Sequence, residues 1–87
     1  MDQSFHIQVA TPTGLLVDTD AVTAQIPAAS GYIGVLPGHA SLLAALGDDK
    51  LSYVTTSSQT RSLVIHGGYV EIHDDQVRVL TPSAEQA

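Results

Sequence analysis

Four histidines are the residues of this chain best suited to bind a metal ion or to transfer a proton near neutral pH. They are His6, His39, His66 and His73. No two of them lie two or four positions apart, the spacings that place two metal ligands on one side of a strand or helix. Because the chain also has no cysteine, we expect histidines at surface or turn positions and no metal site.

Six of the nine acidic residues occur in pairs. Carboxylates are one residue type that acid–base catalysis uses. The pairs are Asp18/Asp20, Asp48/Asp49 and Asp74/Asp75. We place all three at turns, because an aspartate side chain accepts hydrogen bonds from nearby backbone N–H groups. No serine lies in a Gly-x-Ser-x-Gly nucleophile motif. We therefore expect no catalytic residues and no enzyme activity.

Glycine motifs that bind phosphate are also missing from the sequence. Gly31-x-x-Gly34 is too short for the Gly-x-Gly-x-x-Gly fingerprint, and Gly-x-x-x-x-Gly-Lys-Ser/Thr does not occur. We expect no cofactor and no direct nucleotide binding. Gly67 and Gly68 have a structural interpretation instead: they allow backbone to pass close to backbone where the next strand begins.

Short strands are the elements that must position these residues. Apolar and polar residues alternate from Phe5 to Ala10 and from Ala21 to Ile26, where Pro27 is expected to end the strand. Residues 41–46 fit one helical turn or a strand equally well. Further strands are expected at residues 32–36, 51–56, 61–66, 69–73 and 76–80. Because no helical stripe exceeds about two turns, the pattern predicts an all-β sandwich or barrel.

Length and composition limit the partners of this chain. At 87 residues it is long enough for one domain, with an ordered core expected at about residues 4–81 and a frayed tail at 82–87. A formal charge of −6 would be repelled by a phosphate backbone, which argues against nucleic acid as a partner. The sequence shows no signal peptide and no apolar run of ~20 residues. Any membrane association would therefore depend on another protein.

The segment SGYIGVLPGHASLL, residues 30–43, is unusual because it combines three glycines, a proline and a histidine with no acidic residue, lysine or arginine. Glycine accepts positive φ and proline fixes φ near −65°, so this composition indicates backbone of one defined shape. Tyr32, Ile33, Val35 and Leu36 place apolar side chains beside it. Apolar side chains that remain exposed together mark a protein contact.

Several motifs, taken in order, resemble one protein family. They are a Thr-Pro after the first strand, GYIGVLPGHA at residues 31–40, LGDDKLSYV, HGGYVEI and VRVLTPSA. The chain resembles the N-terminal domain of the epsilon subunit of F-type ATP synthases, which is called the delta subunit in mitochondria. The resemblance covers about residues 5–84. Its most specific parts are residues 31–40 and the Gly-Gly-Tyr-Val-Glu-Ile run that begins at Gly67.

The resemblance implies a fold and a mechanical role. The fold would be a ten-stranded β-sandwich of two five-stranded sheets. The role would be that of a non-catalytic rotor subunit in the central stalk, which docks the gamma subunit onto the membrane c-ring and couples proton- or sodium-driven rotation to ATP synthesis. The chain would then be a peripheral protein on the cytoplasmic face of a bacterial inner or plasma membrane, or its organellar equivalent.

The resemblance also implies a c-ring contact loop. Its residues are Gly31, Tyr32, Ile33, Gly34, Val35, Leu36, Pro37, Gly38, His39 and Ala40. Tyr32 stands where the family often has an acidic residue, so a ring contact there would be apolar or made by the hydroxyl. His39 would either bond to the backbone of the turn or contact the ring directly.

The family's C-terminal helical hairpin has no counterpart in these 87 residues. That hairpin carries the family's ATPase inhibition and, in some bacteria, most of its ATP-binding residues, so neither role is transferred to this chain. Two other interpretations stay open. The chain could be a free-standing β-sandwich that binds a small ligand or peptide in an apolar pocket, or a small metal-dependent enzyme if His66 and His73 converge across neighbouring strands.

Overall fold

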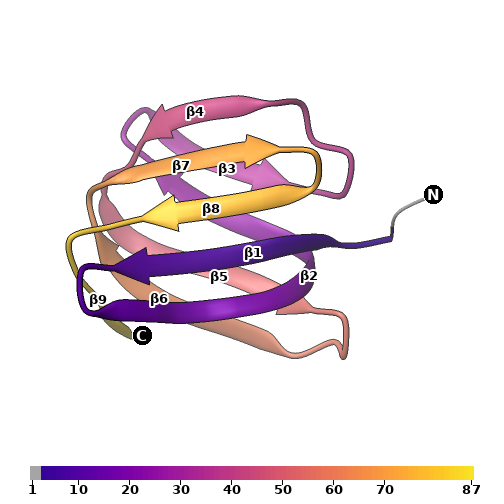
Figure 1. The fold of residues 1–87 in the computed structure, drawn as a ribbon, viewed down its shortest axis with the longest axis horizontal. Helices are drawn as coiled ribbons and strands as arrows, with labels where there is room; N and C mark the ends of the chain where they lie inside the picture. The colour runs from indigo at the N-terminus through magenta and orange to yellow at the C-terminus, as the bar shows by residue number, and fades with distance from the viewer. Residues whose placement is uncertain (1–2) are drawn as a thin grey trace.

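The computed structural model describes residues 3–87, which form nine β-strands and no helix (Figure 1). The strands are β1 (Phe5–Thr11), β2 (Gly14–Ala28), β3 (Gly31–Val35), β4 (Leu42–Ala45), β5 (Asp48–Thr55), β6 (Thr60–His66), β7 (Tyr69–His73), β8 (Gln76–Leu80) and β9 (Ala84–Gln86). Within this part of the chain, no helix is long and apolar enough to cross a membrane. The all-β class predicted from the alternating pattern is confirmed.

The strands pack as two layers because β2 takes part in both (Figure 1). Its first half pairs with β1 as far as Ala21, and its second half pairs with β5 and β3 as far as Ala28. We call β4, β7, β8, β1 and the first half of β2 the front sheet, and β3, the second half of β2, β5, β6 and β9 the back sheet. When the halves of β2 are counted separately, each sheet has five strands, which agrees with the expected sandwich.

The core lies between the two sheets and is built from alternate residues of each strand. In β1, for example, Phe5, Ile7 and Val9 are at most 2% exposed, whereas His6 and Gln8 point away from the core. Aliphatic side chains fill most of the space, and the largest that are fully buried are Ile7, Ile26, Leu51, Ile65 and Ile72. Burial of this one face fixes the register of the strands, since a shift by one residue would turn every apolar side chain outward.

Pro27 does not end its strand as the sequence suggested, because β2 continues to Ala28. Pro27 lies opposite Tyr32 of β3. Its carbonyl accepts a hydrogen bond from the N–H of Gly47 at 2.9 Å, so the polar backbone atoms of Pro27 point away from β3. The missing N–H of proline therefore leaves the β2–β3 ladder intact, which is the condition under which a strand tolerates this residue.

Two other segments can be compared with the expected secondary structure. Residues 41–46, which fitted a helical turn or a strand, contain β4, paired antiparallel with β7. We expected residues 82–87 to fray, but Ala84–Gln86 form β9, paired antiparallel with β6. Ala84 packs against the core, and Glu85 lies 2.7 Å from the His66 ring. These contacts come from residues distant in sequence, which a local pattern does not reveal.

Gly68, just before β7, has the most restricted position of any glycine in the described chain. Its φ is +106°, and a Cβ atom there would lie 1.9 Å from the Leu80 carbonyl oxygen and 2.8 Å from the Thr81 Cα. The segment that leads into β7 thus passes directly against the backbone at the end of β8. The Gly68 carbonyl also accepts a hydrogen bond from the Leu46 N–H at 2.9 Å, which holds this segment in place.

We expect Gly68→Ala to lower the free energy of unfolding by ~3 kcal/mol or more. A residue with a Cβ atom is unfavourable at this positive φ, and the added Cβ would also overlap the backbone at the end of β8. Urea unfolding followed by circular dichroism measures the change. Gly47→Ala is the matched control, since its Cβ would meet no atom closer than 3.8 Å. Equal stability of the two variants would contradict the close approach at Gly68.

Candidate contact surface

The predicted contact loop divides into a strand and a turn. Residues Gly31–Val35 form β3, and residues 36–40 form most of the connection to β4. β3 pairs with β2 alone, so it is an edge strand of the back sheet in the described chain. We call residues 31–40 the β3 edge. Tyr32 lies in β3 and His39 in the turn that follows it, so the ten residues are not one continuous loop.

Hydrogen bonds hold the turn of the β3 edge in one shape. Gly38 N–H donates to the Asp75 carboxylate at 2.7 Å, which joins this turn to the turn between β7 and β8. His39 N–H donates to the Leu36 carbonyl at 3.1 Å. The His39 ring donates through Nδ1 to the Ala40 carbonyl at 2.6 Å. His39 is thus bonded to the backbone of the turn, which is one of the two roles considered for it.

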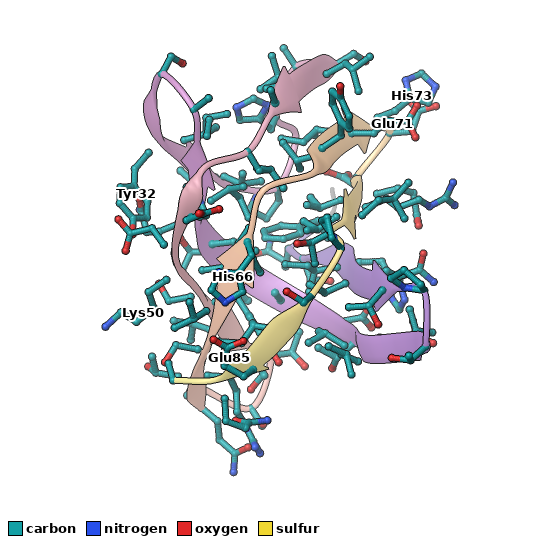
Figure 2. All side chains as sticks on the ribbon, turned by 90° about the vertical axis from the view of Figure 1, so that its left-hand side faces the viewer. Tyr32, Lys50, His66, Glu71, His73 and Glu85 are labelled. Carbon is teal, nitrogen blue, oxygen red and sulfur yellow. The ribbon has the colours of Figure 1, made fainter. Side chains whose placement is uncertain are left out.

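The strand end of the β3 edge is fixed by Tyr32. Its hydroxyl donates to the Lys50 carbonyl of β5 at 2.8 Å, while 52% of the residue stays exposed (Figure 2). Leu36, at the other end of the strand, is 63% exposed. Val35 belongs to the core, and Ile33 packs partly against it. Of these four apolar side chains, Tyr32 and Leu36 are therefore the exposed ones, and they lie at opposite ends of β3.

The histidines do not gather at one place. His66 Nε2 lies 2.7 Å from Glu85, and this carboxylate raises the pKa of the ring above its ordinary value (Figure 2). His73 lies 3.1 Å from Asp74 and 3.1 Å from the Ser41 hydroxyl. In residues 3–87, no group of three histidine, cysteine, aspartate or glutamate side chains could hold a metal ion.

The placement of all three aspartate pairs at turns was correct for only one pair. Asp74 and Asp75 form the β7–β8 turn, with φ values of 50° and 57°. Asp18 and Asp20 lie instead within β2, and Asp48 and Asp49 begin β5. For Asp18 and Asp20 the reason for the error is tertiary: His6 of β1 contacts both carboxylates, so these acids have a partner on the neighbouring strand and do not form a turn.

A second surface was not recognised from the sequence. Tyr69 of β7 lies opposite Leu80 of β8, and Ala10 of β1 lies on the other side of Leu80. Tyr69 is 60% exposed and Leu80 is 53% exposed. Together with Pro12 and Pro82 they line a shallow groove of about 510 Å³ on the front sheet. We call these five residues the apolar patch. The sequence pattern could have indicated this surface, since alternation in β7 places Tyr69 on the exposed face, opposite the buried Val70.

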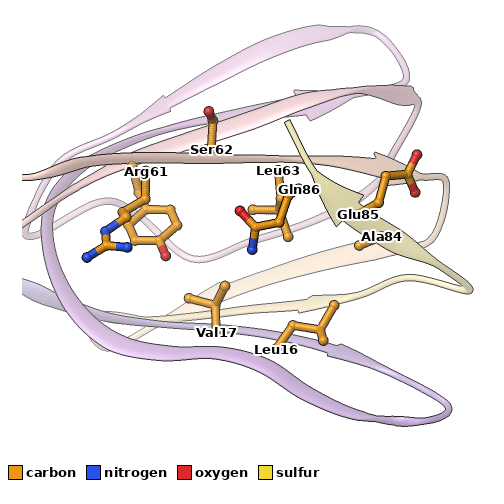
Figure 3. Close-up of a pocket in the computed structure, with 9 residues that line it drawn as sticks. Leu16, Val17, Arg61, Ser62, Leu63, Ala84, Glu85 and Gln86 are labelled. Atoms are coloured by element: carbon orange, nitrogen blue, oxygen red, sulfur yellow. The ribbon is translucent and has the colours of Figure 1, made fainter.

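A further groove of about 350 Å³ opens between the first half of β2 and β9 (Figure 3). Leu16 and Val17 line it from β2, while Arg61 and Leu63 line it from β6. Glu85 lies at its rim on β9. This groove marks the side on which the edges of the two sheets stay apart. It mixes charged with apolar side chains, unlike the apolar pocket that a free-standing ligand-binding sandwich would require.

These features define a class of protein. The chain is a small β-sandwich whose distinctive parts are a fixed strand edge and an exposed apolar patch, the properties of an interaction domain. Residues 4–87 match the family described as "ATP synthase, Delta/Epsilon chain, beta-sandwich domain". The chain therefore belongs to this family, as the motifs at residues 31–40 and 67–72 predicted.

Relatives and solved structures agree with this assignment. The ATP synthase epsilon chain of Solibacter usitatus is 45% identical over 87 residues, which are 100% of this chain and 64% of that protein. The chain thus spans about two thirds of that relative. A chain in the Euglena gracilis mitochondrial ATP synthase superposes with a TM-score of 0.91 at 20% identity, covering 99% of this chain and 55% of that one. A chain in the Tetrahymena thermophila complex gives 0.78 at 14% identity, covering 93% and 65%. The structural matches show the shared fold.

We expect Gly38→Ala to destabilise the turn of the β3 edge by about 1–2 kcal/mol, because its φ of +84° is unfavourable for residues with a Cβ atom. Gly34→Ala is the matched control on the same edge. Gly34 has no positive φ, and its Cβ would make only an ordinary contact, at 3.5 Å, with the Gln25 side chain. Urea unfolding of both variants gives the comparison. A cost at Gly34 equal to that at Gly38 would contradict the glycine requirement assigned to the turn.

Proposed function

We propose that this chain is the non-catalytic β-sandwich part of a central-stalk subunit in a rotary ATP synthase. In this role it joins the gamma subunit to the c-ring, so that ion-driven rotation is coupled to ATP synthesis. The observation that carries the proposal is the family match over residues 4–87. The similar structures support it, since one is of OSCP, F1 and the c-ring of a mitochondrial ATP synthase and the other is of a central stalk with its c-ring.

The β3 edge is the surface that we assign to the c-ring. Hydrogen bonds hold it at both ends. The Tyr32 hydroxyl donates to the Lys50 carbonyl, and the Gly38 N–H donates to the Asp75 carboxylate. A surface fixed before contact loses less conformational entropy on binding, which favours an interface that must transmit torque. The net charge of −6 also suits a basic partner surface, because opposite potentials speed association and fix orientation.

The apolar patch is the surface that we assign to the gamma subunit. Tyr69 and Leu80 are large, exposed and adjacent, and exposed apolar groups of this kind mark protein contacts. The patch lies on the front sheet, whereas the β3 edge belongs to the back sheet. One rigid sandwich therefore presents two separate surfaces and can hold two partners at once. The chain would be a peripheral protein on the cytoplasmic face of a bacterial membrane, attached through the c-ring, or its organellar equivalent.

Two matched double variants test the assignment of both surfaces. Tyr32→Ala with Leu36→Ala removes the exposed apolar groups of the β3 edge, and Tyr69→Ala with Leu80→Ala removes those of the patch. We expect the first variant to weaken binding to the c-ring about tenfold and to leave gamma binding unchanged. We expect the second variant to do the reverse. Binding is measured in a complex reconstituted with the gamma subunit and c-ring, together with ion-driven ATP synthesis.

Each variant serves as the control for the other, because both remove two exposed apolar side chains of the same sandwich. Circular dichroism checks that both remain folded. If both variants bound the gamma subunit and the c-ring like the wild type, and coupling were unchanged, the role of these surfaces would be refuted. If each weakened the other partner instead, the two assignments would have to be exchanged.

A further inference from the structure

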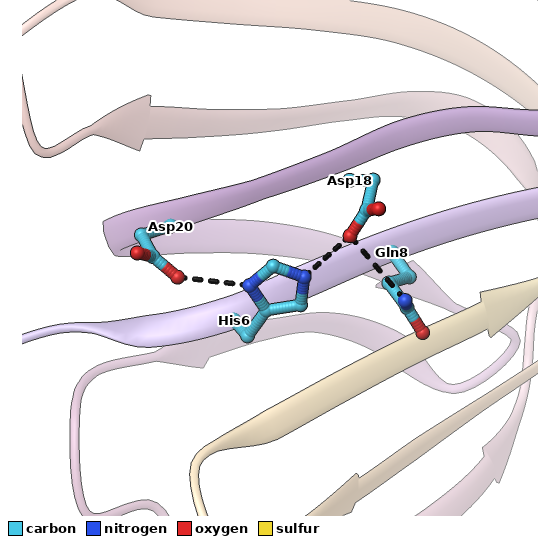
Figure 4. Close-up of polar contacts among 4 residues, drawn as sticks. All are labelled: His6, Gln8, Asp18 and Asp20. Atoms are coloured by element: carbon cyan, nitrogen blue, oxygen red, sulfur yellow. Dashed lines mark hydrogen bonds and ion pairs between the residues drawn. The ribbon is translucent and has the colours of Figure 1, made fainter.

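His6 lies between two carboxylates that β2 supplies from positions two residues apart (Figure 4). Its Nδ1 is 2.8 Å from the Asp20 carboxylate, and its Nε2 is 2.5 Å from the Asp18 carboxylate. Gln8 donates from its side-chain amide to the same Asp18 oxygen at 3.3 Å. The pairing of β1 with β2 creates this arrangement, since it places His6 opposite Asp20 and Gln8 opposite Asp18.

Hydrogen bonds from one ring to two ionised carboxylates need a doubly protonated ring. A neutral imidazole donates from one nitrogen and carries a lone pair on the other, so it can satisfy only one of two carboxylates. An imidazolium donates from both nitrogens, and each bond is strengthened by opposite charges. We propose that His6, Asp18 and Asp20 form a proton-dependent clasp, which ties β1 to β2 when the ring is charged and loses one of its two bonds when the ring releases a proton.

Among the described residues, β8 and the β7–β8 turn supply the polar and charged groups beside His6. β8 places the uncharged Gln76 opposite His6 and places Arg78 opposite Gln8. The β7–β8 turn carries Asp74, which contacts His73, and Asp75, whose backbone carbonyl accepts the His6 N–H at 2.8 Å. Two ionised aspartates and a charged ring give the clasp a net charge of −1, which becomes −2 on deprotonation. Proton release therefore changes both a link between strands and the charge of the front sheet.

The expected pH dependence follows from the direction of each shift. Hydrogen bonding to Asp20 and then to Asp18 raises the pKa of His6, so its contribution to stability is complete below ~6.5, the unfolded value, and is lost as the pH rises through the folded pKa. The bond from His6 lowers the pKa of Asp18, so that contribution is present above ~3.9 and is lost as the pH falls through the folded pKa. The clasp is strongest between these limits and weakens above pH ~6.5.

An NMR titration of the His6 ring in the intact chain tests the proposal directly. We expect the ring to titrate above the ordinary value of ~6.5 in the wild type, and to move back toward it when Asp18→Asn and Asp20→Asn are combined. The wild-type titration needs no variant, so the test survives if the double variant fails to fold. A wild-type ring that titrates at or below ~6.5, or a double variant that titrates like the wild type, would overturn the clasp.

Urea unfolding at pH 5.5 and pH 9 tests whether the clasp stabilises the fold. We expect His6→Gln to raise the unfolding equilibrium constant about three- to tenfold at pH 5.5, and to have a smaller effect at pH 9, where a smaller fraction of wild-type rings carries the second proton. His6→Lys is the control that keeps a positive charge, and its stability relative to His6→Gln should be similar at both pH values. If His6→Gln had the same effect at both pH values, proton dependence would be excluded.

Discussion

The structure depends on β2 being a single strand that hydrogen-bonds in both sheets. Its ladder with β1 reaches Ala21, where its ladder with β5 begins, and the register shifts between Ala21 and Thr23. Such a bulge bends and twists a strand, which lets it pass from one layer to the other. Ala21 and Ala24 are fully buried beside this bend. Their small side chains leave room for the backbone of both sheets to come close together.

The positions of both proposed contact surfaces follow from this constraint. β3 continues the antiparallel pairing of the second half of β2, so the β3 edge is placed by the back sheet. The apolar patch lies on β1, β7 and β8 and on the connections that follow β1 and β8, and these strands join the first half of β2 in the front sheet. Because one strand connects the two sheets covalently, the two surfaces keep a fixed relation. A fixed relation between the two surfaces suits the proposed role, in which the chain holds two partners at once.

The sequence predicted those features that depend on local order along the chain. Alternation identified the strands that contain Phe5, Leu51 and Val77, and the family motifs identified the sandwich. The sequence did not predict β9, because its three residues have no alternating pattern of their own. They are ordered by pairing with β6. The sequence pattern also began β2 at Ala21 and missed the first half of the strand, where alternation is weak. Asp18 and Asp20 were consequently assigned to a turn, although a histidine distant in sequence explains them.

Across β7, β8 and β1, the outer face of the front sheet changes from apolar to polar and charged along the direction of the strands. At one end, Tyr69 and Leu80 form a cross-strand pair in the apolar patch. Two residues further along each strand, Glu71 lies opposite Arg78. The next pair is His73 and Gln76, and Gln76 lies beside His6 of the clasp. Protein interfaces commonly have an apolar centre and a polar, solvated rim. A partner centred on the apolar patch would therefore place the charged residues, including the clasp, at its rim. There a change of one charge would alter the rate of association and the orientation of the partner more than the total affinity.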